Sequence, residues 1–88
     1  MTPLTIKTTY ERSGYRIERI TGFTPFQLDR LNRMPYQDMK VEIIKILFEK
    51  NGIELKPEDI LQTWVGADAL FVETPKNLQG EIADEQLP

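Results

Sequence analysis

The segment from Tyr36 to Asn51 places the strongest constraint on how this chain of 88 residues can fold. At about 100° per residue, its apolar side chains spread over most of the circumference of a predicted helix. Four of its polar residues, Asp38, Glu42, Lys45 and Glu49, form one narrow stripe. Such a helix has to be covered from two sides. We therefore predict that it is the hub of the core, with a hairpin on one side and the first helix, the C-terminal elements or a partner chain on the other.

The N-terminal residues predict this hairpin. Residues 4–12 and 15–20 alternate with a period of two and flank Ser13-Gly14. A two-residue loop gives a face that we assign to the core, Ile6, Thr8, Tyr10, Tyr15 and Ile17. The opposite face, assigned to solvent, carries Thr5, Lys7, Thr9, Glu11, Arg16 and Glu18. A three-residue loop over 12–14 suits the turn chemistry better but would divide the apolar face, so we favour the shorter loop.

The clearest local signal is the start of a helix at Thr24. Thr24 is a typical N-cap, Pro25 suits the first helical position, and Gln27 occupies the place of a capping-box partner. Phe23 and Leu28 occupy the two positions of a hydrophobic staple. A proline at position 35 disfavours helical geometry in the residue before it, so this helix ends near position 34 and a second helix can begin.

The C-terminal half is less sharply patterned. Ile53–Leu55 is a candidate short strand, and the residues from Pro57 to Val65 have the spacing of a third helix, which Gly66 ends. Ala69–Glu73 then predicts a strand. In a competing interpretation, Leu61–Val65 is itself a strand that pairs with 69–73. We favour the helix followed by the strand.

These elements predict one compact two-layer α+β domain over residues 1–73. Its N-terminal β-hairpin packs on the central buried helix, and the element order is β-β-α-α-β-α-β. Residues 74–88 are polar, acidic and without periodicity, so we expect a mobile tail there.

The composition excludes several kinds of chemistry. The sequence has no cysteine and no histidine, which removes disulfides, thiolate nucleophiles, zinc fingers and histidine-based bases or metal sites. No spacing of the remaining polar residues singles out a catalytic group, so we predict a protein that is not an enzyme and uses no cofactor or metal. The apolar runs 46–48 and 69–72 are far shorter than the ~18 residues that span a bilayer, and the first residues resemble no signal sequence. We expect a cytoplasmic protein that is not in a membrane.

One short stretch resembles a known family. The residues Asn51-Gly52-Ile53 through Pro57-Glu58-Asp59-Ile60, which follow an amphipathic helix, are similar to the same region of the small tautomerases. The resemblance covers about ten residues, and those enzymes use an N-terminal proline that loss of methionine exposes. Here Thr2 precedes Pro3, so the catalytic role is not carried over and we assign no family.

Charge divides the chain into two halves. Residues 1–40 carry seven Lys or Arg against four Asp or Glu, whereas residues 41–88 carry four against ten. All five arginines lie in the first half. Because arginine grips carboxylates and phosphates with a planar fork, this segregation suggests a function, unless the arginines pair with the acidic half or cluster by chance.

The candidate site lies on the first helix. Phe26, Arg30 and Arg33 fall on one outward face, opposite its apolar side chains, and Arg16 and Arg19 of the hairpin add positive charge. Aromatic and arginine side chains are typical of protein-binding hot spots. We therefore predict a small regulatory, inhibitory or accessory factor that binds another protein, and a homodimer. The alternative is an arginine-dependent nucleic-acid-binding protein. In a third interpretation, the aromatic packs inward and the arginines are solvated.

Overall fold

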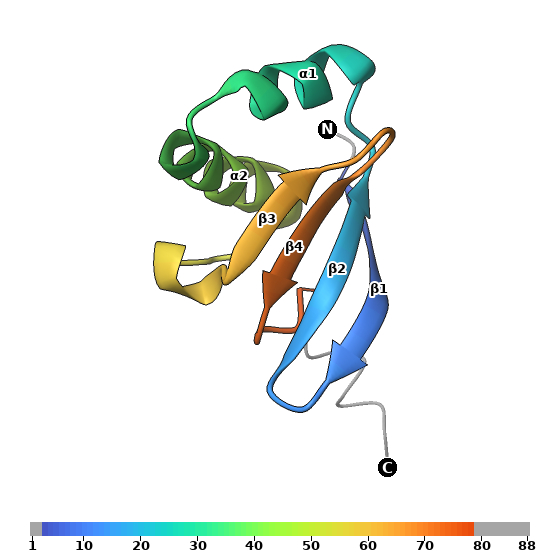
Figure 1. The fold of residues 1–88 in the computed structure, drawn as a ribbon, viewed down its shortest axis with the longest axis vertical. Helices are drawn as coiled ribbons and strands as arrows, with labels where there is room; N and C mark the ends of the chain where they lie inside the picture. Colours follow the sequence, from blue (N-terminus) through green and yellow to red (C-terminus); the bar gives the residue numbers. More distant parts are fainter. Residues whose placement is uncertain (1–2, 79–88) are drawn as a thin grey trace.

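The computed structural model describes residues 3–78 and confirms the α+β class. Its elements are β1 (Thr5–Arg12), β2 (Tyr15–Thr21), α1 (Pro25–Arg33), α2 (Tyr36–Asn51), the 3-10 turn η1 (Pro57–Asp59), β3 (Gln62–Val65) and β4 (Leu70–Thr74). The strands form one antiparallel sheet in the order β1-β2-β4-β3. Both helices lie toward one end of this sheet, and the β1–β2 hairpin extends away at the other end (Figure 1).

The core lies between the helices and one face of the sheet, which we call the inner face. The sheet supplies three fully buried apolar residues, Ile20, Leu70 and Val72, and the helices supply Leu28, Leu31, Met39, Ile43 and Leu47. The buried positions of α2 recur every four residues, so they form a single stripe along the helix. The opposite side of α2 keeps Val41 60% and Phe48 54% exposed.

The hairpin has the predicted two-residue loop but not the predicted faces. Arg12 pairs with Tyr15 across Ser13 and Gly14, while the register shifts between Thr8 and Tyr10. This β-bulge leaves Thr9 without a partner in the ladder and reverses the alternation beyond it. The assignment of the distal apolar residues to the core is therefore wrong: Tyr10, Tyr15 and Ile17 share the opposite face of the sheet, and the buried residue of β2 at this level is Glu18.

The structure also corrects the segment between α2 and β4. Ile53–Leu55 forms no strand, and the predicted third helix is wrong, because its start makes only the single 3-10 turn Pro57–Asp59. Gln62–Val65 is a strand, as the competing interpretation had it, and pairs with β4. Pairing lets this segment satisfy backbone groups of β4, and Thr63 is buried while Trp64 faces outward, which is the period of a strand.

The residues after β4 return to the inner face of the sheet. Thr74, the first residue assigned to the tail, is the last of β4 and fully buried, and Leu78 is only 3% exposed. The backbone N–H of Leu78 donates to Glu18 Oε2 at 3.3 Å. Residues 75–78 thus cover part of the sheet, and the remainder of the predicted tail, 79–88, lies outside the described residues.

The start of α1 is held by the predicted capping box. Thr24 Oγ1 accepts from the backbone N–H of Gln27 at 3.1 Å, and Gln27 Oε1 accepts from the backbone N–H of Thr24 at 2.8 Å. Replacing Thr24 by alanine should lower the free energy of unfolding by about 1 kcal/mol, because one N-terminal N–H loses its partner. Chemical denaturation followed by circular dichroism measures this loss. An unchanged midpoint would contradict the cap.

Candidate functional site

The second face of the sheet, which we call the outer face, lies opposite the helices. Strand register places four of its side chains in one row across all four strands, in the order Lys7, Arg19, Phe71 and Trp64. Neighbours in such a row have Cβ atoms about 5 Å apart. The row therefore puts two cationic side chains beside two aromatic rings.

The adjacent row toward the hairpin loop continues the apolar surface. It consists of Tyr10, Ile17, Glu73 and Gln62, in this order across the sheet. Arg12 and Tyr15 follow at the end of the hairpin. Tyr10 is 49% exposed, and Ile17 and Tyr15 are half-buried. The outer face thus presents four aromatic residues and an isoleucine.

Two local contacts hold aromatic rings of this face in place. The rings of Trp64 and Phe71 are stacked, with centroids 5.5 Å apart and planes inclined by 7°. Gly66 gives Phe71 its room, since a Cβ there would lie 2.8 Å from the Phe71 ring. At the hairpin end, the Arg12 guanidinium lies 5.9 Å from the centroid of the Tyr15 ring and donates to the Tyr15 hydroxyl at 3.2 Å. Prearranged rings lose little conformational entropy when a partner binds.

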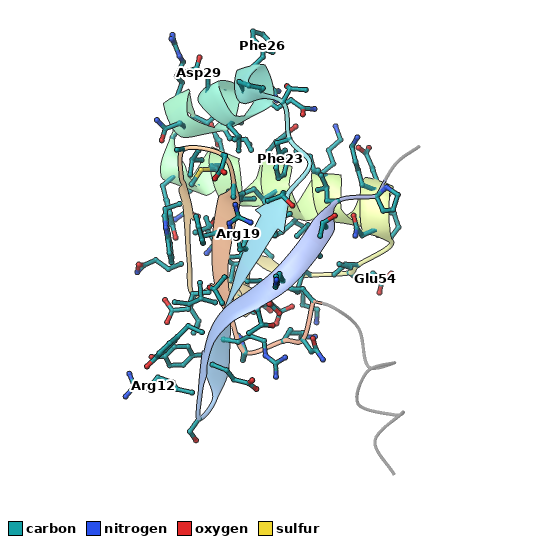
Figure 2. The ribbon with its side chains drawn as sticks, turned by 90° about the vertical axis from the view of Figure 1, so that its right-hand side faces the viewer. Arg12, Arg19, Phe23, Phe26, Asp29 and Glu54 are labelled. Carbon is teal, nitrogen blue, oxygen red and sulfur yellow. The ribbon has the colours of Figure 1, made fainter. Side chains whose placement is uncertain are left out.

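The predicted site residues do not form one surface. Phe26, Arg30 and Arg33 share the exposed side of α1, and Phe26 is 77% exposed, so it does not pack inward. Arg16 and Arg19 lie on opposite faces of β2, because they are three positions apart and successive side chains of a strand alternate between its faces. Figure 2 shows Phe26 at one end of the molecule, Arg12 at the other and Arg19 between them.

Within residues 3–78, four of the five arginines pair with a carboxylate. These pairs are Arg16–Glu11 at 3.0 Å, Arg19–Asp68 at 3.4 Å, Arg30–Glu42 at 3.4 Å and Arg33–Asp29 at 2.9 Å. Two of them, through Asp68 and Glu42, join the arginine-rich half to the acidic half, as one interpretation of the sequence held. The positive charge of the arginine-rich half is therefore largely compensated by these neighbouring carboxylates.

Sequence reasoning missed the aromatic residues of the outer face. Trp64 and Phe71 are neighbours only when 62–65 is a strand, so the helical interpretation hid their pairing. Tyr10 and Tyr15 were assigned to the core because the bulge carries no residue signature in Thr8-Thr9-Tyr10. The competing interpretation, in which Leu61–Val65 is a strand that pairs with 69–73, contained the signal for the pair Trp64 and Phe71.

Neither a metal centre nor a known family explains this surface. Within residues 3–78, no three acidic side chains gather closely enough to hold a metal ion, and no helix of that range is long and apolar enough to cross a membrane. No protein-family model, curated protein or solved structure matches the chain. The short resemblance to the tautomerases gains no support from these comparisons, so function rests on the geometry of the surface.

Proposed function

We propose that this chain is a small non-catalytic cytoplasmic factor that binds another protein through the outer face of its sheet. The observation that carries the proposal is the uncovered aromatic surface around the stacked pair Trp64 and Phe71. Tryptophan, tyrosine and arginine are the residues that dominate the energy of protein interfaces. A protein partner would cover the rings. The polar residues around the rings, such as Lys7 and Gln62, would then form the rim of the contact.

The ion pairs favour a protein ligand over a nucleic acid. Phosphate binding releases counterions from cationic side chains, whereas Arg19 already pairs with Asp68 on this face. Arg12, a further cation of this face besides Lys7, lies 5.9 Å from the centroid of the Tyr15 ring and donates to its hydroxyl. Phosphates would have to displace these contacts, while a protein surface with both signs of charge can extend them.

One observation supports nucleic acid as a second candidate ligand. The row Lys7, Arg19, Phe71 and Trp64 places cations beside aromatic rings on an open sheet, the combination with which single strands are bound. In that case affinity would fall steeply with salt, and Lys7→Ala would flatten the dependence. A protein complex of this face would depend on salt only mildly.

Alanine substitution of Trp64 tests the proposed surface. After the partner is captured from the native host and identified, Trp64→Ala should weaken its binding by about 2 kcal/mol or more, a rise in Kd of about thirtyfold. Isothermal titration of the purified pair measures this, with circular dichroism confirming that the variant is folded.

Two matched variants make the test specific. Gln62→Ala changes a polar residue of the same strand, and Phe26→Ala removes the exposed ring of α1. Each should alter Kd less than about threefold if the outer face is the contact. If Phe26→Ala weakens binding and Trp64→Ala does not, the contact lies on α1. A normal affinity in all three variants would refute both surfaces.

Self-association belongs to the same proposal. Val41 and Phe48 are exposed apolar side chains of α2, a helix that packs on the inner face. A contact through α2 would leave the outer face free for the other protein. We therefore propose that the factor acts as a homodimer.

A further inference from the structure

The exposed side of α2 carries a regular seam. Gln37, Val41, Ile44 and Phe48 follow one another at spacings of four, three and four residues, which is the a/d spacing of a coiled coil. Gln37, Val41 and Phe48 are exposed and Ile44 is half-buried. The contact between α2 and α1, through Glu42 and Arg30, lies on a different side of the helix, so α1 does not cover the seam.

Charged residues flank this seam in a pattern that selects its partner. Asp38 and Lys45 lie one heptad apart on one flank, and Lys40 lies on the other flank. The first flank therefore carries an acid near the start of the helix and a base near its middle. Such a flank is complementary to a copy of itself running in the opposite direction.

We propose that α2 pairs with α2 of a second copy of this chain, antiparallel, about a twofold axis between Val41 and Ile44. In this arrangement, which gives the homodimer of the proposed function its geometry, Val41 meets Ile44 of the second copy and Gln37 meets Phe48. Asp38 of each copy lies beside Lys45 of the other, so the twofold axis forms this ion pair twice.

The same charges disfavour the parallel arrangement. In a parallel pair, the flanking residue of one helix faces the residue five positions further along its partner. Lys40 would then face Lys45 of the second copy, twice. The orientation of the pair thus follows from repulsion in one arrangement and attraction in the other.

A groove at the C-terminal end of α2 is consistent with this pairing. It has a volume of about 510 Å³ and is lined by the apolar side chains of Ile44, Phe48 and Leu55 and by the charged residues Lys45, Glu54, Lys56, Asp59 and Lys76. Lys76 pairs with Asp59 at 3.8 Å. Antiparallel pairing brings the first turn of the second α2, which carries Asp38, over this end of the helix. Asp38 of the second copy then approaches Lys45, one of the three lysines that line this groove.

The proposed pairing has a consequence for the interaction surface. Because α2 covers the inner face of the sheet, a dimer through α2 leaves the outer face of each copy uncovered, with the two faces directed away from each other. The dimer would present two copies of the Trp64 surface, and a partner with repeated sites would bind with higher avidity. This consequence rests on the proposed partner contact of the outer face, whereas the pairing through α2 does not.

Exchanging the charged residues of α2 tests the pairing with the purified 88-residue chain alone. Sedimentation over a concentration series in the micromolar range should show a dimer for the unmodified chain. Asp38→Lys and Lys45→Asp should each weaken it by about tenfold in Kd, because each replaces two attractive contacts by repulsive ones. The double variant should restore the dimer to within about threefold.

The remaining outcomes oppose the proposal. A monomer at every concentration would overturn it, and so would a dimer that Val41→Glu leaves intact, since that exposed residue lies at the axis. A tighter dimer with Lys45→Asp alone would indicate the parallel arrangement.

Disulfide cross-linking gives an independent check of the direction of the two helices. Because the sequence has no cysteine, a disulfide between Gln37→Cys and Phe48→Cys chains, mixed in equal amounts, would form in the antiparallel arrangement. Loss of the dimer with normal partner binding would refute this inference and the proposed homodimer, and would leave the outer-face contact with the partner intact.

Discussion

Replacing Glu18 by alanine is expected to lower the free energy of unfolding by about 3 kcal/mol, because it leaves the half-buried Thr8 hydroxyl and the buried backbone N–H of Leu78 without their acceptor. Glu18 is fully buried on the inner face of the sheet. Its Oε1 accepts from the hydroxyl of Thr8 at 2.6 Å, and its Oε2 accepts from the backbone N–H of Leu78 at 3.3 Å. The side chain therefore connects β1, β2 and the segment that follows β4. Urea denaturation of the purified variant measures the loss.

Two further variants separate this role from a general effect of charge. Glu18→Gln keeps an acceptor for one of the donors and should cost less, about 1 kcal/mol. Glu11→Ala removes an exposed carboxylate of the same hairpin, which pairs with Arg16, and should cost less than about 1 kcal/mol. Equal losses in the three variants would contradict the hydrogen-bonded role of Glu18.

Local signals in the sequence predicted much of this fold. The capping box at Thr24, the two-residue loop Ser13-Gly14 and the left-handed Gly52 after α2 are each determined by residues close in the chain. The α+β class followed from these elements. Chemistry within a few residues decides such features, so one sequence is enough to find them.

The errors arose where distant residues decide the structure. The apolar residues Ile60, Leu61, Trp64 and Val65 have the spacing of a helix, but pairing with β4 makes 62–65 a strand. The bulge at Thr9 depends on the pairing of β1 with β2, and it moves Tyr10 from the predicted core to the outer face. The candidate surface was missed for this reason, because each of its rows combines residues from all four strands.

The wide apolar band of α2 divides into two sides with different roles, and adjacent residues can show the division. Leu47 is fully buried, whereas Phe48 is 54% exposed on the proposed seam. Leu47→Ala should lower the free energy of unfolding by about 3 kcal/mol at any protein concentration, since it leaves a cavity in the core. Phe48→Ala should cost less than about 0.5 kcal/mol in dilute solution, because the ring contributes little to the monomer.

The concentration dependence of stability then distinguishes the core from the seam. If α2 forms the dimer, the unmodified chain should gain stability as its concentration rises through the dissociation constant, since association draws the equilibrium toward the folded state. The Phe48→Ala variant should no longer gain stability with concentration. The Leu47→Ala variant should still gain it, although its stability is lower at every concentration. Denaturation midpoints measured at several concentrations reveal both effects. A midpoint that is independent of concentration in all three proteins would show that the exposed side of α2 serves a purpose other than self-association.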